Sequence, residues 1–344
     1  MAVLVTGGAG YIGSHMVWAL LDAGEDVVVI DRLSTGFRWA VAPGARFYLG
    51  DVGDPVILQQ IFSENDISAV IHFAGSVVVP DSIRRPLSYY ENNTGNTRTL
   101  MAATLDAGIR HFIFSSTAAV YGANGIDRPI TETDPLAPQT PYGLSKLMSE
   151  MMLQDAAAAH GLRYVALRYF NVAGADPELR TGQSTQNASH LVKAAVETAL
   201  GKRRKMDVFG TDYPTRDGTG VRDFIHVADL VSAHLAALAY LRAGGEPLVA
   251  NCGYGTGYSV LEVLRAVMEE SGRRFEVNYM PRRDGDMGSV IADASLLRTQ
   301  LNWTPQHDNI HDIVRTSLEW ELMLSRRNTL SVSAMQQRLA SINF

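Results

Sequence analysis

Tyr142 and Lys146 are the residues of this sequence whose types and spacing most clearly suggest chemistry. They stand in the segment TPYGLSK as Tyr-x-x-x-Lys. Residues four apart lie on one face of a helix, so we expect the phenol and the ammonium to point the same way. A free phenol titrates near about 10 and is a poor base at neutral pH, but a neighbouring cation favours the phenolate. Such a pair can take a proton from a hydroxyl group.

A glycine-rich turn follows the first apolar run of the chain. Gly7, Gly10 and Gly13 form the pattern Gly-x-x-Gly-x-x-Gly and open a helical pattern. Glycine allows a tight turn and a close approach of the backbone to a pyrophosphate, which the helix N-terminus then binds. Asp31 ends the next apolar run, where a carboxylate accepts hydrogen bonds from ribose hydroxyls and repels a 2′-phosphate. These features predict NAD rather than NADP, although the adjacent Arg32 is a residue type that can assist a 2′-phosphate.

Apolar runs alternate with helical patterns over the first half of the chain. We expect strands at 2–5, 26–30, 46–50, 69–73, 111–115 and 164–169, and helices at 11–23, 55–64, 86–107 and 141–160. Continuous apolar strands separated by helices indicate a parallel sheet covered on both faces. The sequence therefore predicts an α/β fold, with a doubly wound parallel sheet of the Rossmann type and a smaller α/β C-terminal domain.

The alternating pattern weakens after residue 171. We assign residues 1–170, with a returning segment at about 221–245, to a cofactor-binding domain, and residues 171–220 with 246–325 to a substrate-binding domain. Helices are expected at about 190–200, 227–240, 260–271 and 311–324. Residues 326–344 are polar and weakly periodic, and we interpret them as a frayed C-terminal tail.

Further candidate side chains follow two of the predicted strands. Thr117, after Ser115 and Ser116, can hydrogen-bond a reacting oxygen or relay a proton. The alternative is that these hydroxyls only cap the strand. Asp51 stands where the adenine of a dinucleotide would lie, and the alternative here is a cap for the helix that begins at Pro55. Both interpretations remain open at the level of the sequence.

Composition excludes several classes of protein. The net charge is -6, so nucleic-acid binding is not expected. The single Cys252 permits no internal disulfide, and we interpret it as a small buried residue. No apolar run approaches the ~20 residues of a membrane span and no signal peptide is evident, so we expect no membrane contact and a cytoplasmic location. The histidines show no ligand spacing, so no metal is expected and His226 is interpreted as a packed structural residue.

Several segments of the chain resemble those of a known family: VTGGAGYIGSH, VIHFAG, PLSYYENN, FIFSSTAAVYG, PYGLSKLMSE, LRYFNVAGA, FGTDYPTRDGTGVRDFIHV and PRRDGDM. Through them the sequence resembles the extended short-chain dehydrogenases/reductases, and within that group the UDP-glucose 4-epimerases. The resemblance spans roughly residues 2–322. It implies NAD-dependent interconversion of UDP-glucose and UDP-galactose, in which C4 is oxidised to a 4-keto intermediate that rotates and is reduced again.

The resemblance also implies roles for individual residues. Tyr142 would be the catalytic base and acid, Lys146 would orient the nicotinamide ribose and lower the pKa of Tyr142, and Thr117 would contact the reacting oxygen. The implied cofactor-binding residues are Gly7, Gly10, Tyr11, Ile12, Gly13, Asp31, Asp51, Val52, Phe73, Ala74, Asn92, Tyr142, Lys146 and Phe170. The implied UDP-hexose-binding residues are Thr117, Tyr142, Asn171, His190, Leu191, Phe209, Arg222, Arg283, Asp286 and Val290.

Some positions depart from the family's pattern. Thr117 replaces the usual Ser but keeps the hydroxyl, and Val77 stands where many members have a Lys that reaches the cofactor. His190 stands where Asn is common, and Phe224 where Tyr is common, so one hydroxyl contact is expected to be lost. Val290 is small for a position where a large side chain closes the sugar pocket, which implies some activity on UDP-N-acetylhexosamines.

Related proteins of the same fold provide the alternatives. These are an epimerase of UDP-N-acetylhexosamine or UDP-pentose, a nucleotide-sugar dehydratase, and a non-catalytic NAD-sensing protein. Dehydratases carry an acidic pair directly after the Thr, where this chain has Ala118 and Ala119, so elimination of water is disfavoured. The presence of Tyr142 and Lys146 argues against a non-catalytic protein. A homodimer formed by the helices at 86–107 and 141–160 is expected by analogy.

Overall fold

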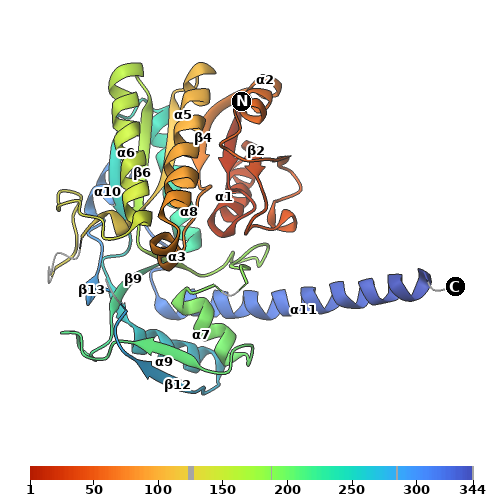
Figure 1. Ribbon diagram of the computed structural model, residues 1–344, viewed down its shortest axis with the longest axis vertical. Coiled ribbons are helices and arrows are strands. Elements are labelled where there is room, and N and C mark those ends of the chain that lie inside the picture. Colours follow the sequence, from red (N-terminus) through yellow and green to blue (C-terminus); the bar gives the residue numbers. More distant parts are fainter. Residues whose placement is uncertain (123–127, 187, 284–285, 343–344) are drawn as a thin grey trace.

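The computed structural model describes residues 1–122, 128–186, 188–283 and 286–342, with side chains described as far as residue 328. The chain forms an upper lobe around a large sheet and a lower lobe around smaller sheets (Figure 1). One long helix near the C-terminus starts in the lower lobe and extends beyond it (Figure 1). The site candidates come from both lobes.

The large sheet has seven parallel strands in the order β10-β6-β5-β4-β1-β2-β3. Their bounds are Ala2–Thr6 for β1, Asp26–Asp31 for β2, Arg46–Leu49 for β3, Ile67–His72 for β4, His111–Thr117 for β5, Arg163–Tyr169 for β6 and Leu248–Cys252 for β10. The strand order reverses between β1 and β4, the point at which such sheets bind ligands. The predicted doubly wound α/β fold is confirmed.

Helices cover both faces of this sheet. One face carries α1 (Tyr11–Asp22) and α8 (Val227–Arg242), and the other carries α2 (Pro55–Glu64), α5 (Asn96–Asp106) and α6 (Pro141–His160). Side chains of β1 alternate between the two resulting cores, since Val3 and Val5 belong to the first and Leu4 to the second. Burial on both faces explains why the strands read as continuous apolar runs.

The region expected as one helix at 86–107 is helical but interrupted. It contains α4 (Pro86–Tyr89), the π-helical turn η2 (Tyr90–Gly95) and α5, and the short helix α3 (Val79–Arg84) precedes it. At the wide turn, the Asn93 side chain accepts from the Ser76 N–H at 2.7 Å and donates to the Ser76 carbonyl at 3.0 Å. These bonds fix the segment after β4 against the turn. Wide turns of this kind often mark functional sites.

The lower lobe is built around β9 (Val221–His226), which pairs with β7 (Asn171–Ala173), β11 (Gly257–Ser259) and β13 (Ser289–Val290). A second pair joins β8 (Met206–Phe209) to β12 (Val277–Met280). The elements of the chain not yet named, in either lobe, are α7 (Leu191–Ala199), α9 (Val260–Ser271), α10 (Ser295–Gln300), η1 (Arg38–Ala40) and η3 (Ala118–Val120). The segment at about 221–245 was expected to return to the large sheet. Its helix α8 packs on that sheet, whereas its strand β9 belongs to the lower sheet. The following strand, β10, forms an edge of the large sheet.

Helix α11 spans Ile310–Ile342, so the segment that we interpreted as a frayed C-terminal tail is helical through residue 342. The stretch 326–342 contains neither glycine nor proline to end the helix. Its start is anchored by the buried Ile313, Val314 and Trp320. The guanidinium carbon of Arg327 then lies 4.0 Å from the ring centroid of Trp39, which stacks on Trp320 at 6.1 Å. Among the described residues, no helix is both long and apolar enough to cross a membrane.

The turn between β1 and α1 gives a testable constraint on stability. A Cβ at Gly13 would lie 2.2 Å from the Gly7 carbonyl oxygen, and this backbone cannot yield cheaply. We predict that Gly13→Ala lowers the free energy of unfolding by about 1–3 kcal/mol, the usual cost of overpacking. Gly44→Ala is the control, because its Cβ would meet only the Leu21 side chain at 3.4 Å. Chemical denaturation measures both, and wild-type stability of the Gly13 variant would contradict the prediction.

Candidate active site

The glycine-rich turn lies where the strand order reverses. Gly7 has a φ of 70°, and a Cβ on it would lie 2.7 Å from the Ala74 nitrogen after β4. Helix α1 begins at Tyr11, directly after the extended Gly10, so its first N–H groups lack intrahelical partners. Bare backbone and free N–H groups at this edge fit the pyrophosphate of a dinucleotide.

Asp31 supports the same turn from the end of β2. Its carboxylate accepts from the Ala9 N–H at 3.0 Å and from the Leu33 N–H at 2.7 Å. A carboxylate offers about four lone-pair sites, so this one can still accept from ribose hydroxyls. The guanidinium of Arg32 donates to Asp51 at 2.7 Å. This ion pair holds Arg32 and is consistent with NAD rather than NADP.

Asp51 lines a cleft of about 640 Å³ beside this turn. Other lining residues are Arg32, Ser34, Thr35, Gly75, Ser76, Val77, Tyr89, Asn92 and Asn96. Asn92 donates to the Ser76 hydroxyl at 2.8 Å, and Asn96 donates to Asp51 at 2.9 Å. The alternative role of Asp51 as a helix cap is wrong, because α2 is capped by Asp54, which accepts from the Val56 N–H at 2.9 Å.

The other predicted cofactor residues differ in accessibility. Val52 is buried, Ile12 is half-buried against the core, and Phe73 packs on the ring of His234 with 4.8 Å between centroids. The Tyr11 hydroxyl donates to the Gly174 carbonyl at 2.7 Å, and burial raises the pKa of this phenol. The Tyr11 side chain therefore ties α1 to the segment that follows β7.

Helix α6 presents the predicted catalytic pair. The Thr140 side chain caps its N-terminus by accepting from the Gly143 N–H at 3.2 Å, and Pro141 starts the helix with a preset φ. A Cβ at Gly143 would lie 2.2 Å from the Ala119 carbonyl oxygen. The bare glycine thus lets α6 approach the chain that follows β5. This contact brings Tyr142 to the end of that strand.

Tyr142 is buried, and the Thr117 hydroxyl lies close enough to its phenol to favour the charged form. Thr117 also accepts from the Ala119 N–H at 3.2 Å, so it caps η3 as well as contacting the phenol. The ring of Tyr89 meets that of Tyr142 edge-on, with 6.5 Å between centroids. Burial raises the pKa of Tyr142, and the nearby Thr117 hydroxyl opposes this effect. Additional positive charge is therefore needed to favour the phenolate.

Lys146 is buried one helical turn further on. Its ammonium donates to the Ser115 carbonyl at 2.8 Å and lies 4.8 Å from the centroid of the Phe114 ring. Burial lowers the pKa of Lys146 to about 8, while Glu150 acts in the opposite direction. The Ser115 hydroxyl is hydrogen-bonded to the Tyr169 hydroxyl at the neighbouring strand end. Tyr142 and Lys146 thus share a helix face and meet the carboxyl end of β5, as the spacing predicted.

The lower lobe gathers most of the predicted sugar-nucleotide residues. The guanidinium carbon of Arg283 lies 3.7 Å from the centroid of the Phe209 ring. Arg222 is half-buried on β9; burial lowers its pKa and the Asp286 carboxylate opposes this. Val290 on β13 is the register partner of Arg222. An aromatic face, two guanidinium groups and a carboxylate suit a base, a pyrophosphate and a ribose.

The remaining predicted contacts lie at element starts. Asn171 is exposed on β7, in register with Phe224 on β9. His190 is exposed immediately before α7, 3.4 Å from the Gln183 amide, and Leu191 is the first residue of that helix. The backbone N–H groups at this helix start are a further potential anion site.

The two lobes meet in a small apolar cluster beside the catalytic pair. Val290 from the lower lobe packs in it with Ala118 and Tyr121 after β5. Phe170 after β6 and Leu147 beside Lys146 pack against the same cluster. Val290 is therefore close to the chain segments that carry Thr117 and Lys146.

Sequence reasoning missed several residues of this region. The Ser115 carbonyl that holds Lys146 is a backbone group, which no residue type can signal. Tyr89, Asn93 and Tyr169 reach the site only through the folded chain. Glu150 was detectable, because it continues the helix face of Tyr142 and Lys146 at the same four-residue spacing.

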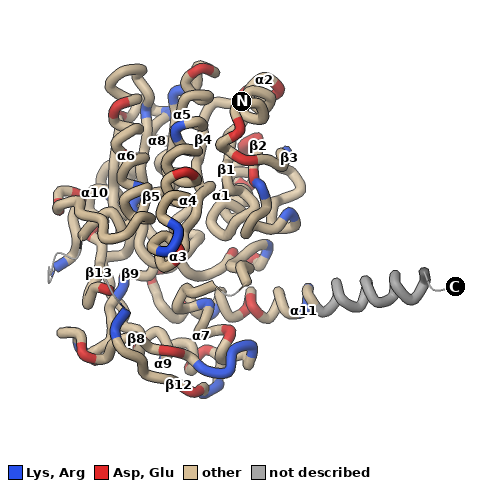
Figure 2. The backbone as a smooth tube through the Cα atoms, in the orientation of Figure 1, with Lys and Arg blue, Asp and Glu red and all other residues tan. Residues whose placement is uncertain are grey.

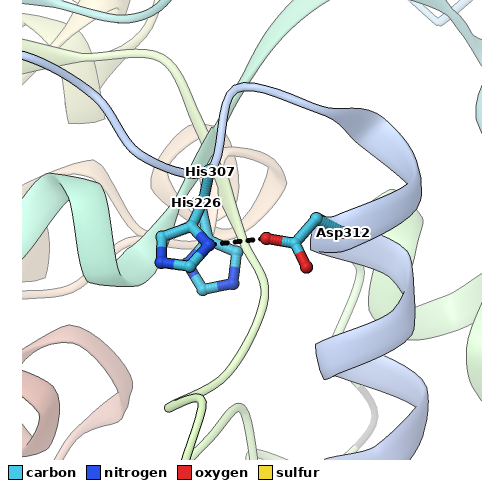
Figure 3. Close-up of side chains that lie close together, drawn as sticks. All are labelled: His226, His307 and Asp312. Carbon is cyan, nitrogen blue, oxygen red and sulfur yellow. Dashed lines mark hydrogen bonds and ion pairs between the residues drawn. The ribbon is translucent and has the colours of Figure 1, made fainter.

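His226, His307 and Asp312 form a further cluster of side chains (Figure 3). His226 accepts from the Ala228 N–H at 3.0 Å through Nδ1, so its Nε2 donates to the Thr316 hydroxyl at 2.9 Å. The rings of His226 and His307 stack with 4.5 Å between centroids, and burial lowers the pKa of His226 to about 3. Both ring nitrogens of His226 are thus engaged in hydrogen bonds within the protein, as expected for a structural residue. Cys252 is likewise buried, and burial raises the pKa of its thiol.

Comparisons with known proteins agree with this geometry. Residues 3–253 match the family model described as the NAD dependent epimerase/dehydratase family. A UDP-glucose 4-epimerase from Azospirillum brasilense is 53% identical over 324 residues, covering 94% of this chain and 93% of the relative. The structure of a UDP-glucose 4-epimerase from Bifidobacterium longum in complex with NAD+ and UDP has a TM-score of 0.89 and 37% identity, with 94% of this chain and 98% of that chain covered. The UDP-Glc/GlcNAc 4-epimerase from Campylobacter jejuni has a TM-score of 0.82 and 44% identity, with 94% and 99% covered.

The chain therefore belongs to the NAD dependent epimerase/dehydratase family. Within that family it is an NAD-dependent enzyme of the epimerase class, and the relatives that it resembles over nearly their whole length are UDP-glucose 4-epimerases.

Proposed function

We propose that this enzyme interconverts UDP-glucose and UDP-galactose by inverting the configuration at C4 of the hexose. The observation that carries the proposal is the juxtaposition of Tyr142 with Thr117 and the buried Lys146, at the edge where the glycine-rich turn also lies. The aromatic and guanidinium groups of Phe209, Arg222 and Arg283 support the nucleotide half of the substrate. The names of the relatives agree with this substrate.

The proposed cofactor residues are those predicted from the sequence. The turn at Gly7, Gly10 and Gly13 would hold the pyrophosphate, Asp31 the adenosine ribose, and Lys146 the nicotinamide ribose. NAD, when bound there, supplies a hydride acceptor and donor for C4. As a phenolate, Tyr142 would be favoured by the positive charge of the oxidised ring as well as by Lys146. A lowering of the phenol pKa by about 3 units requires roughly 4 kcal/mol of differential stabilisation, which the Lys146 ammonium and the oxidised nicotinamide would have to supply.

The proton chemistry falls to Tyr142 and Thr117. As a phenolate, Tyr142 would take the proton of the sugar O4 and later return it to the oxygen of the 4-keto intermediate. Thr117, which already contacts the phenol, would hydrogen-bond the reacting oxygen. The lower-lobe residues would keep the UDP fixed while the keto sugar rotates about its phosphate link. No proton or water is consumed overall.

Among the alternatives, elimination of water is disfavoured, since Ala118 and Ala119 provide neither acid nor base. A non-catalytic NAD-sensing role is disfavoured by the assembled Tyr142 and Lys146. The proposed division assigns residues 1–170 and about 221–245 to the cofactor, and 171–220 with 246–325 to the substrate; the place of β10 in the large sheet favours adding 248–252 to the first part. Lys and Arg are mixed with Asp and Glu over both lobes (Figure 2). The expectation of a cytoplasmic enzyme that binds no nucleic acid stays a prediction.

Replacing Tyr142 tests the proton chemistry. We predict that Tyr142→Phe reduces turnover of UDP-galactose at least about a hundredfold, the usual contribution of a general base. Binding of UDP, measured by calorimetry, should stay within about threefold of the wild type, since the UDP anchor is untouched. Tyr164→Phe removes the hydroxyl of another buried tyrosine, on β6, and serves as the control. Near-normal turnover in the Tyr142 variant would reject the assigned role.

The size of the pocket gives a second prediction, resting on the proposed substrate class. Val290 is buried beside Ala118 and Tyr121, where a larger side chain would reduce the room for a 2-acetamido group. We predict measurable conversion of UDP-N-acetylglucosamine by the wild type, and its selective loss in Val290→Tyr with UDP-glucose conversion retained. The Campylobacter jejuni relative is named for both glucose and N-acetylglucosamine substrates. No wild-type conversion of the acetylated sugar would reject the prediction.

We also propose a homodimer formed through the helices of the upper lobe. Leu87 on α4 and Met148 and Met151 on α6 are exposed apolar side chains, and Leu87 is 79% exposed. Burying them in a second copy would remove this apolar surface from water. We predict that the wild type sediments as a dimer and that Met151→Glu shifts the population towards monomers. Val56→Glu, an exposed apolar position on α2, is the control. A monomeric wild type would contradict the proposal.

A further inference from the structure

A buried ion pair lies directly behind the catalytic helix. Glu150 on α6 and Arg168 on β6 are both about 5% exposed. Arg168 donates through Nη2 to Oε2 at 2.6 Å, and through Nε to Oε1 at 3.0 Å. Both carboxylate oxygens therefore accept from the same guanidinium. Such a pair is poor evidence for stability, because apolar residues of the same volume often serve folding as well.

The ion pair is bonded to the strand end that carries the catalytic hydroxyl. Ser116 donates its hydroxyl to Glu150. Ser116 stands between Ser115, whose carbonyl accepts from Lys146, and Thr117, whose hydroxyl contacts Tyr142. The carboxylate thus fixes the middle of a three-residue segment whose two flanking residues hold the catalytic pair.

Arg168, the second member of the pair, is bonded to a residue beside the proposed sugar pocket. Arg168 donates through Nη1 to the Tyr121 hydroxyl at 2.9 Å, and Tyr121 donates to the Asn251 amide oxygen at 2.8 Å. Tyr121 packs in the cluster that contains Val290. One hydrogen-bonded chain therefore connects β5, α6, β6 and β10 behind the site. All three nitrogens of Arg168 take part in it.

We propose that Glu150 is a positioning residue, which together with Arg168 holds Lys146 and the end of β5 in their working arrangement. This inference rests on the proposed roles of Tyr142 and Lys146. In an apolar replacement of the pair, the helix could still pack on the sheet, but Ser116 would lose its acceptor. The carboxylate that balances a buried ammonium on the same helix face would also be lost.

The charges around Lys146 define the expected effect. On α6, the titratable neighbours of Lys146 are Tyr142 and Glu150. His72 on β4 also lies near Lys146, and Arg168 and Tyr169 on β6 lie further from it. Burial lowers the pKa of His72 to about 3, so this ring is neutral at working pH. Glu150 raises the pKa of Lys146 against burial. Glu150→Gln would remove the negative charge and leave the Arg168 cation.

The test follows the Lys146 ammonium directly in the NAD-bound enzyme. Lysine labelled with ¹³C at Cε reports its titration by NMR, and Lys146→Arg assigns the signal. We expect Glu150→Gln to move the titration of Lys146 to lower pH by about one unit or more, in the usual range for a neighbouring charge. The alkaline limb of kcat against pH should move with it. Glu321→Gln is the matched control, because it removes a buried carboxylate of the Lys193 ion pair in the lower lobe.

Two further variants separate charge from position. Glu150→Asp keeps the charge on a shorter stem, so the titration should stay near that of the wild type while kcat falls at least tenfold and KM changes little. The double variant Glu150→Gln with Arg168→Met leaves no unpaired charge, so it is testable even where the single variant fails to fold. It should also lose kcat at least tenfold. Wild-type kcat in the double variant, or an unshifted titration in a folded Glu150→Gln, would overturn the proposal. Loss of function in Tyr142→Phe is independent of both readouts.

Discussion

The site depends on one buried ammonium that is held between a helix and a strand end. Lys146 donates to the Ser115 carbonyl, and its ammonium lies over the Phe114 ring. Because Tyr142 lies one turn earlier on the same helix, fixing Lys146 also fixes the phenol against Thr117. Moving α6 relative to β5 would break all three contacts together. The close approach of Gly143 to the Ala119 carbonyl shows how tightly that helix must pack.

The two lobes have different roles, which follow from this constraint. The upper lobe is a rigid sheet whose reversal point supports the glycine-rich turn and the catalytic pair. The lower lobe supplies Phe209, Arg222 and Arg283, which are suited to hold a nucleotide by its base and phosphates. A sugar joined to an anchored nucleotide can then change its orientation without leaving. Tyr142 needs to serve only one oxygen, whichever face of the sugar is presented.

Much of the fold was predictable from the sequence, because parallel strands buried on both faces read as unbroken apolar runs. The turn at Gly7 and the pair Tyr142 and Lys146 were predictable because local spacing determines their geometry. The break at η2 was not, since it depends on Asn93 binding the backbone of a distant segment. The extent of α11 beyond residue 325 was missed because its helix contacts include Trp39 from the other end of the chain. Backbone acceptors such as Ser115 leave no trace in residue types.

The central claim is that the hydrogen on C4 leaves and returns within the enzyme, while Tyr142 handles only the proton on O4. The most direct test is conversion of UDP-glucose that carries deuterium at C4, in ordinary water, with the position of the label in UDP-galactose read by mass spectrometry and NMR. The account predicts that the label stays at C4 through many turnovers. Loss of the label to solvent at the rate of conversion would contradict it.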